Sequence, residues 1–340
     1  MFSILAQNAA QESVPVTSLI ALLIFGIVFL LVLILKFKLQ AFLALIVVSV
    51  IVSIGATFVN PDQAAGLTEI GQTIVKSMGG ALGFIATIIG IGAIFGAMLE
   101  HSGGTQSLAN TLVRKFGQKK APWAMLLTGF IISIPVFLDV ALVILAPLLY
   151  ALARDTKKSV LVFGLPLVAG MAVTHAFVPP TPGPVAVAYF LNVNLGYVIG
   201  FGVLVGLPTA IICGPFLCSR MAKLVEVTTP TDQGEDLTSE EKKLPSFLQI
   251  ASLIALPIAL ILAGTIVEQS AISGIDPGLT KAERNAQVAD ILNSMPTTNQ
   301  VIHFLGHPVI ALMISTLLAI FFLGISRGTS KEDLVEISTK

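Results

Sequence analysis

The sequence predicts an all-α polytopic membrane protein with inverted repeats, a re-entrant hairpin and a broken helix. The first observation is composition, since 55% of the 340 residues are hydrophobic and only 11% are charged, whereas a soluble domain has about a quarter of its residues charged. The second is a series of apolar runs about as long as a bilayer-spanning helix, and the third is the placement of prolines and basic clusters within and around two of these runs. The 19 basic and 19 acidic residues balance and form no basic face, so nucleic-acid binding is not expected.

Eight apolar runs are long enough to enter a bilayer. They cover residues 16–35, 39–58, 81–99, 121–153, 159–192, 195–219, 246–267 and 305–325. No basic stretch precedes the first run, which is therefore interpreted as an uncleaved span after a short tail, 1–15, outside the membrane. With the N-terminus outside, all but three of the 19 Lys and Arg residues lie inside, the exceptions being Lys76, Lys281 and Arg284. This agrees with the preference of basic loops for the cytoplasm.

The run 121–153 is predicted to enter and leave the membrane on one side, because basic clusters flank it at both ends. Pro135 divides it into arms of which the shorter, at ~1.5 Å per residue, is too short for a ~30 Å hydrocarbon core. The run is therefore interpreted as a helical hairpin with Ser133, Ile134 and Pro135 at its tip. Such non-helical backbone is tolerated at membrane depth only against protein or water.

The run 159–192 is predicted to be a broken helix. Four prolines occur in the six residues 179–184, and proline lacks the amide that continues a helix. We expect one helix up to about Val178, an unwound segment, and a second short helix from about Val185. Freed carbonyls and helix-terminal amides near mid-membrane suit an anionic substrate or a coupling ion.

Five crossings precede residue 220, so the later part of the chain is expected to have inverted topology. Short matches support a repeat: Ser18–Leu22 recurs at 252–256, and the pattern Leu-x-Glu-Ile at 67–70 recurs at 334–337. The predicted organisation is a first repeat at 16–223, a cytoplasmic linker at 224–245, and the start of a second, incomplete repeat at 246–340. A short helix is expected around 281–292.

Two titratable residues within the spans suggest the chemistry. Asp139 is the acidic residue well inside an apolar run, where a charge costs on the order of 2.5 to 3.5 kcal/mol; ion or proton handling is favoured over a role capping the second hairpin arm. His175 stands one turn before the unwound segment, next to Thr174. Proton relay and a hydrogen-bonded core histidine are equally good interpretations of this residue.

Other chemistries find no support in the sequence. Cys213 and Cys218 do not have metal-ligand spacing and are interpreted as small core residues. The spans show no Ser/His pair, paired carboxylates or H-E-x-x-H motif. We therefore expect no enzyme activity, no cofactor, no catalytic residue and no metal site. Glu100 and His101, at the end of a span, and His303 and His307, around the last span, are interpreted as interfacial.

The segments Ile134-Pro135-Val136-Phe137-Leu138-Asp139-Val140 and 173–184, Val-Thr-His-Ala-Phe-Val-Pro-Pro-Thr-Pro-Gly-Pro, resemble the gluconate permease (gluconate:proton symporter) family. The similarity extends from about Phe25 to about Arg327. It implies a fold of the ion-transporter superfamily and a multi-pass protein of the bacterial inner membrane that imports gluconate or a related sugar acid with protons. By position, it implies that Asp139, Ser133, Thr174, His175, Thr181 and Gly183 bind substrate or ion.

Two departures from the family pattern leave alternatives open. Family members often have His where Thr181 stands, and they continue past the position of Lys340 through a second hairpin and broken helix. The substrate could instead be glycerate or D-serine, and the chain could be a truncated or partner-dependent module that does not transport. Protons are favoured over sodium as the coupling ion because of Asp139 and His175. The sequence leaves a homo-oligomer open.

Overall fold

The computed structural model describes residues 16–59, 66–222, 224–225, 227, 244–273, 275 and 281–339. Regular structure in these ranges is helical, without strands, and the predicted all-α class is confirmed. The expected tail, 1–15, and most of the expected linker, 224–245, lie outside the described residues.

Within the described ranges, seven helical segments are long and apolar enough to span a membrane. They are Val16–Leu35, Ala41–Val59, Ile70–His101, Leu161–Leu191, Leu195–Cys218, Phe247–Ile272 and Pro308–Arg327. Seven of the eight predicted runs thus become candidate spans, and the eighth is the hairpin. The chain is a multi-pass membrane protein.

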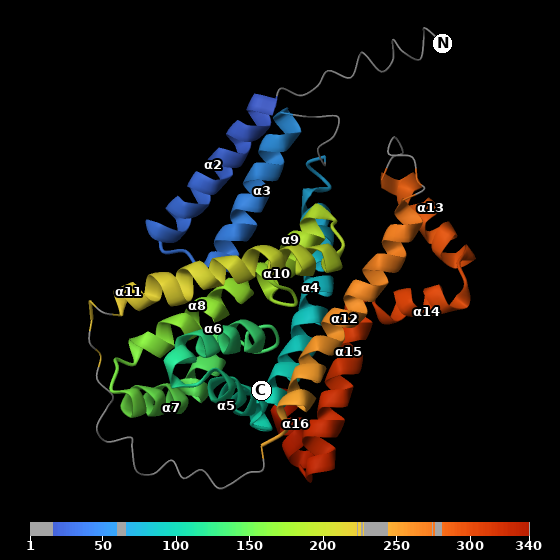
Figure 1. The fold of residues 1–340 in the computed structure, drawn as a ribbon. Coiled ribbons are helices and arrows are strands. Elements are labelled where there is room, and N and C mark those ends of the chain that lie inside the picture. The colour runs from blue at the N-terminus through green and yellow to red at the C-terminus, as the bar shows by residue number, and fades with distance from the viewer. Residues whose placement is uncertain are drawn as a thin grey trace. The chain divides into compact units, whose positions relative to one another are not determined.

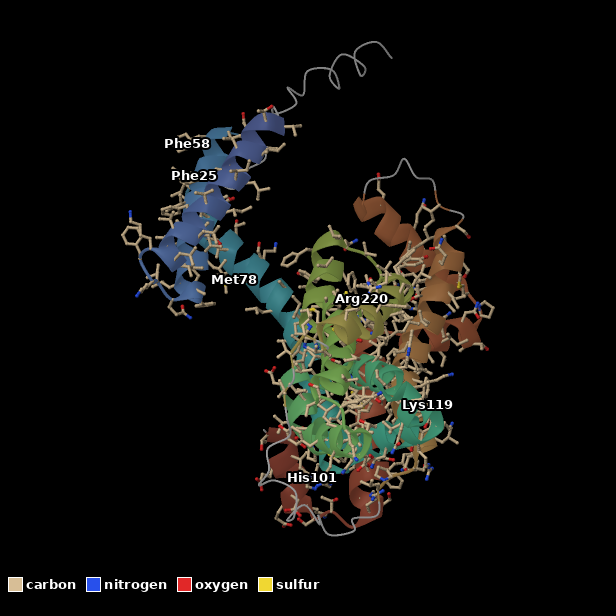
Figure 2. The ribbon with its side chains drawn as sticks, turned by 60° about the vertical axis from the view of Figure 1, so that its left-hand side comes forward. Phe25, Phe58, Met78, His101, Lys119 and Arg220 are labelled. Carbon is tan, nitrogen blue, oxygen red and sulfur yellow. The ribbon has the colours of Figure 1, made fainter. Side chains whose placement is uncertain are left out.

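The chain divides into two compact units, residues 1–83 and 84–340. In the first, α2 (Val16–Leu35) and α3 (Ala41–Val59) form a helical hairpin (Figure 1). Gly26 lies against Val52 and Gly55 against Leu22, so small residues let the helices approach closely. Figure 2 shows Phe25 and Phe58 projecting outward from this pair; their side chains are 50% and 77% exposed, as expected for helices that face lipid.

The division into a first repeat at 16–223 and the start of a second at 246–340 remains a prediction.

The second unit contains the remaining helices, and α4 (Ile70–His101) runs through the boundary. In chain order they are α5 (Gly104–Phe116), α6 (Ala121–Ile132), α7 (Leu138–Thr156), α8 (Leu161–Phe177), α9 (Pro182–Leu191), α10 (Leu195–Ile211), α11 (Ser219–Met221), α12 (Phe247–Ile272), α13 (Lys281–Ser294), α14 (Thr297–Leu305), α15 (Pro308–Ala319) and α16 (Lys331–Thr339). In Figure 1, α5 to α8 lie together, and α12 and α15 lie side by side.

The predicted hairpin is present as α6, a turn and α7. α6 has 12 residues, about 18 Å at 1.5 Å per residue, which is well short of a ~30 Å hydrocarbon core. It packs against α8 through glycines: a Cβ added to Gly129 would meet the Leu167 carbonyl, and one added to Gly170 would meet the Leu126 carbonyl. The two backbones are therefore in contact, and the short arm is buried in protein, as a non-spanning helix must be.

The predicted break is also present. α8 ends at Phe177 and α9 begins at Pro182, three residues earlier than expected, with Thr181 as its N-cap residue. Proline is favoured at the first position of a helix because its missing amide has no partner there and its φ angle is already helical. Prolines therefore both stop α8 and start α9.

Three helices were not predicted: α5, α14 and α16. They have 13, 9 and 9 residues, too few for a search based on bilayer-length runs. α5 buries Leu108, Ala109 and Leu112 in the largest core cluster, together with Phe95 of α4 and Leu145 of α7. This cluster fixes the base of the hairpin against α4 and α8.

Candidate substrate and ion site

A small pocket lies where the tip of the hairpin meets the break between α8 and α9. Its cavity has a volume of about 20 Å³, enough for about one water molecule. The lining residues are Ile89, Gly92, Ala93, Ser133, Ile134, Pro135, Val136, Phe137, His175, Pro180, Thr181 and Pro182. Both predicted interruptions thus converge on one place, and the contact that joins them links residues 42 positions apart in the sequence.

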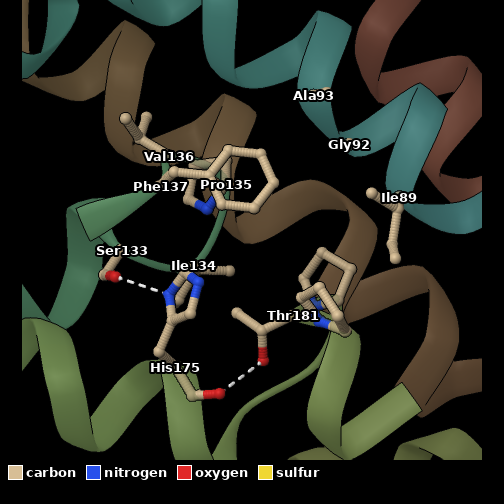
Figure 3. A pocket seen from close by; sticks show the side chains of 12 residues that line it. Ile89, Gly92, Ala93, Ser133, Ile134, Pro135, Val136, Phe137, His175 and Thr181 are labelled. Atoms are coloured by element: carbon tan, nitrogen blue, oxygen red, sulfur yellow. Dashed lines mark hydrogen bonds between the residues drawn. The ribbon is translucent and has the colours of Figure 1, made fainter. Parts of the chain in front are cut away.

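The side chains of Ser133 and His175 connect the hairpin to the broken helix. Ser133 Oγ lies 3.2 Å from His175 Nδ1, and Ser133 is fully buried. The ring of Phe137 lies 5.8 Å from the imidazole, centroid to centroid. Figure 3 shows the imidazole between Ser133 and Phe137. The ring is therefore held by a polar contact at its edge and by an aromatic neighbour.

Thr181 stabilises the unwound segment from within. Its hydroxyl donates to the carbonyl of Val178, at 2.7 Å, and to that of His175, at 3.1 Å. Figure 3 shows the bond to His175. These carbonyls need a donor because Pro179 and Pro182 stand four residues further on and have no amide to offer. Thr181 therefore replaces helix hydrogen bonds that the prolines remove, and its side chain is 4% exposed.

Asp139 lies at the start of α7, outside the pocket lining. The N-cap residue is Phe137, and no described side chain caps this helix, so the capping interpretation of Asp139 is not supported. The carboxylate is exposed and within electrostatic range of His175. A negative charge in the first turn of a helix interacts favourably with the helix dipole, by about 0.3 to 1 kcal/mol.

Thr174 and Gly183 do not line the pocket. Thr174 is buried, and its hydroxyl donates to the carbonyl of Phe130 at 2.9 Å. It joins α8 to the first arm of the hairpin. Gly183 is exposed on the first turn of α9, and a Cβ there would meet nothing within 4 Å. The structure thus brings together Ser133, His175 and Thr181 of the six predicted residues.

The two helix N-termini at the site differ in the donors they offer. The first turn of α9 contains Pro182 and Pro184, which have no N–H group. Gly183 is therefore the residue between them whose N–H has no acceptor within the helix and is free to bind a ligand. The first turn of α7 contains no proline. The amide-rich terminus is therefore that of the hairpin arm, whereas the sequence led us to expect the second piece of the broken helix to supply the amides.

A second cavity, of about 410 Å³, adjoins the pocket and shares Ala93, Pro135, Val136 and Phe137 with it. Glu100 and His101 of α4 line its other part. Phe137, 42% exposed, thus stands between the small pocket and the larger cavity. Sequence reasoning missed Phe137 and the residues of α4. In the sequence, the feature of α4 that marks this contact is the glycine at position 96. In the structure, a Cβ at Gly96 would meet the Pro135 carbonyl, so glycine lets the hairpin tip lie against α4.

With this geometry established, comparison with known proteins decides the family. Residues 18–340 match the family described as GntP family permease. The chain belongs to this family. The resemblance to gluconate permeases that the hairpin and proline motifs indicated is therefore confirmed.

Several curated relatives of this GntP-family chain share about a third of its residues. It is 35% identical over 331 residues to the inner membrane permease YgbN of Escherichia coli K12, covering 94% of this chain and 66% of that protein. It is 33% identical over 309 residues to the high-affinity gluconate transporter of the same strain, covering 91% and 64%. It is 35% identical over 312 residues to the gluconate permease of Bacillus subtilis 168, covering 89% and 63%.

The GntP-family chain spans just under two thirds of the length of these relatives. No solved structure matches it. In the part of the chain that the structure describes, no group of three or more His, Cys, Asp or Glu residues is placed to hold a metal ion.

Proposed function

We propose that the chain is a secondary active transporter that imports gluconate or a closely related sugar acid by proton symport across the bacterial inner membrane. The observation that carries this proposal is the meeting of the hairpin tip and the broken helix at Ser133, His175 and Thr181. Discontinuous helices place polar backbone and helix ends at membrane depth, where a carrier binds its cargo. Relatives named as gluconate transporters support the substrate class.

The charges at the site suggest how an anion and a proton are coupled. Among the described residues that line the pocket there is no Lys or Arg, so the substrate carboxylate would depend on hydroxyls, the imidazole and the amides that begin α7. An ionised Asp139 near His175 would repel that carboxylate. Protonation of Asp139 removes this repulsion, and protonation of His175 adds a positive charge that offsets it, so the anion binds best together with a proton. Symport requires such linkage.

Alternating access would follow from movement at Phe137. The central pocket, at about 20 Å³, is too small for a sugar acid, whereas the adjoining cavity, at about 410 Å³, is within the size of small-molecule sites. Displacing the Phe137 ring joins the two spaces. The described conformation is then an occluded one, and movement of the hairpin tip against α4 opens it. The N-terminus is assigned to the outside on the distribution of basic residues.

The test is uptake of labelled gluconate into proteoliposomes that contain the chain, with and without an inward proton gradient. Unlabelled L-idonate, glycerate and D-serine serve as competitors, since one relative is named as an L-idonate transporter. We expect gradient-stimulated uptake that sugar acids inhibit and D-serine does not. Uptake that follows a sodium gradient instead would overturn the choice of coupling ion, and no gluconate uptake under any gradient would overturn the proposal.

A further inference from the structure

A third cavity lies apart from the central pocket and has a different chemistry. Its volume is about 730 Å³, within the range of about 300 to 1,000 Å³ that is typical of small-molecule sites. It is bounded by the connection of α9 to α10, by the last turns of α12, and by the junction of α14 and α15. It shares no lining residue with the central pocket. We refer to it as the chamber.

One part of the chamber wall is a hydrogen-bonded network centred on Asn194, the N-cap residue of α10. Its side-chain oxygen accepts from the backbone amide of Gly196, at 2.8 Å, and from Thr265 Oγ1, at 2.7 Å. Its amide nitrogen donates to the carboxylate of Glu268. Both polar side-chain atoms of Asn194 are thus engaged, and Glu268 is held in a fixed orientation at the chamber wall. A carboxylate so held is a ready acceptor for substrate hydroxyl groups.

A second part of the wall is made by two histidines, one on each side of the turn between α14 and α15. His303 lies in the last turn of α14, and His307 is the N-cap residue of α15. Between them, Gly306 packs on Gly264 of α12, where an added Cβ would lie 2.8 Å from the Gly306 Cα. Glycine at both positions therefore lets the turn approach α12 and brings both imidazoles to the chamber.

The protonation of His307 suits a ligand with hydroxyl groups. Desolvation and the neighbouring imidazole of His303 lower the pKa of His307 below its ordinary value of about 6.5. At neutral pH the ring is therefore uncharged and can both donate and accept a hydrogen bond. A side chain that is always cationic would bind any anion. The neutral imidazole of His307 can instead recognise hydroxyl groups on the ligand, because it both donates and accepts.

Two further features of the chamber wall suit the carboxylate group and the C–H faces of a polyhydroxylated acid. Two helices begin at its wall, α10 with 17 residues at Asn194 and α15 with 12 residues at His307, and helix N-termini attract anions. Tyr189, stacked on Phe84 with ring centroids 5.7 Å apart, supplies an aromatic surface. The chamber thus presents anion-binding helix ends, hydroxyl-binding groups and an apolar surface together.

A small apolar cavity, which we call the apolar constriction, borders both the chamber and the central pocket. It has a volume of about 10 Å³; it shares Leu195 and Ile261 with the chamber, and shares Ile134, Pro135 and Pro180 with the central pocket. The described residues that line it all have apolar side chains. A ligand in the chamber is therefore separated from His175 by apolar side chains, as expected for a closed gate in a transport path.

We propose that the chamber is a second binding site, at which a small polyhydroxylated carboxylate is held by His303, His307 and Glu268 before it passes to the central pocket. This inference rests on the proposed function, because it assumes the same class of substrate. It adds a site on the far side of the apolar constriction, with its own set of recognising residues.

The test is protection of a single cysteine from a membrane-impermeant thiol reagent. Cys213 and Cys218 are replaced by alanine and Val193, which lines the chamber and is 42% exposed, is replaced by cysteine (Val193→Cys). At gluconate about tenfold above its dissociation constant, labelling should slow about tenfold. Ser270→Cys, exposed on α12 away from the chamber lining, should be labelled at the same rate with and without gluconate. Glucitol, which lacks the carboxylate, should protect poorly.

Two further variants separate this proposal from the proposed function. His303→Gln with His307→Gln should abolish protection of Val193→Cys without changing the labelling rate in the absence of ligand. Ser133→Ala with His175→Asn should leave protection intact while uptake is lost. No protection of Val193→Cys in a chain that still imports gluconate, or protection that survives loss of both histidines, would overturn the chamber site and leave the transport proposal standing.

Discussion

At the scale of single residues, Ser133 and His175 join two elements that the chain brings together from far apart. The contact between Ser133 Oγ and His175 Nδ1, at 3.2 Å, is buried on the serine side. A buried polar group that loses its partner costs about 1 to 3 kcal/mol, so this contact holds the imidazole in the orientation seen in Figure 3.

Replacing Ser133 by alanine should therefore weaken substrate binding. We expect the KM for gluconate to rise about tenfold, since about 1.4 kcal/mol corresponds to a factor of ten. The measurement is the concentration dependence of uptake into proteoliposomes. Ser102→Ala is the matched control, because the Ser102 hydroxyl donates to the carbonyl of Leu99 and lines neither the central pocket nor the cavity next to it. An unchanged KM in Ser133→Ala would show that the contact has no role in binding.

Asp139 should carry the coupling to protons. Asp139→Asn removes the charge that protonation would neutralise, so uptake should lose its stimulation by an inward proton gradient while gluconate exchange continues. Asp155→Asn, in the last turns of the same helix and exposed, is the control and should keep the stimulation. If Asp139→Asn leaves the rate and pH dependence of uptake unchanged, Asp139 is not the coupling residue.

The sequence predicted the members of this site better than their roles. Ser133, His175 and Thr181 were identified because each lies beside a helix break, and breaks can be recognised from proline. The role of Thr174 depends on which carbonyl lies within reach, and Phe130 is 44 residues from Thr174. Local pattern does not contain such long-range contacts, and the same holds for the position of Phe137 beside the imidazole.

At the scale of elements, the packing of α6 on α8 holds the hairpin in place. Backbone meets backbone at Gly129 and Gly170, so no side chain can move to make room for a larger residue. This explains how a helix of 12 residues is stable without spanning the bilayer, since it is surrounded by protein.

Gly129→Ala should destabilise the hairpin. Overpacking of this kind typically costs about 1 to 3 kcal/mol, and the thermal midpoint of the detergent-solubilised protein should fall. Trp123, the one tryptophan of the chain, lies on α6, so its fluorescence reports directly on this element. Gly164→Ala on α8 is the control, because its added Cβ would lie 3.7 Å from Leu149 Cδ1 in ordinary contact. Equal midpoints for both variants would contradict close packing at Gly129.

Elements of bilayer length were predictable, and shorter ones were not. The long spans, the hairpin and the break follow from apolar runs, basic flanks and prolines. Helices α5 and α16 have 13 and 9 residues and low apolar content, so the same criteria pass over them. The chamber could not be predicted, because it is assembled from residues between 84 and 308 whose proximity depends on the tertiary fold.

At the scale of the whole molecule, the described second unit contains a series of cavities that meet at shared residues. The 410 Å³ cavity adjoins the central pocket at Phe137, and the apolar constriction borders both the central pocket and the chamber. The narrowest parts of this series lie at the hairpin tip and the proline-rich break. These are also the elements that depart from regular helix, so a change in their conformation would open or close the path at either end.

Ala93 is the position at which passage of substrate through the pocket between the hairpin tip and the broken helix can be tested. It lies on regular helix α4 and lines both the pocket and the cavity next to it. Ala93→Cys, with Cys213 and Cys218 replaced by alanine, is treated with a thiol reagent before uptake of labelled gluconate is measured. Ala86→Cys, exposed on the same helix, is the control. We expect modification at position 93 to abolish uptake and gluconate to slow the modification, with neither effect at position 86. Complete modification at position 93 with undiminished uptake would contradict this expectation.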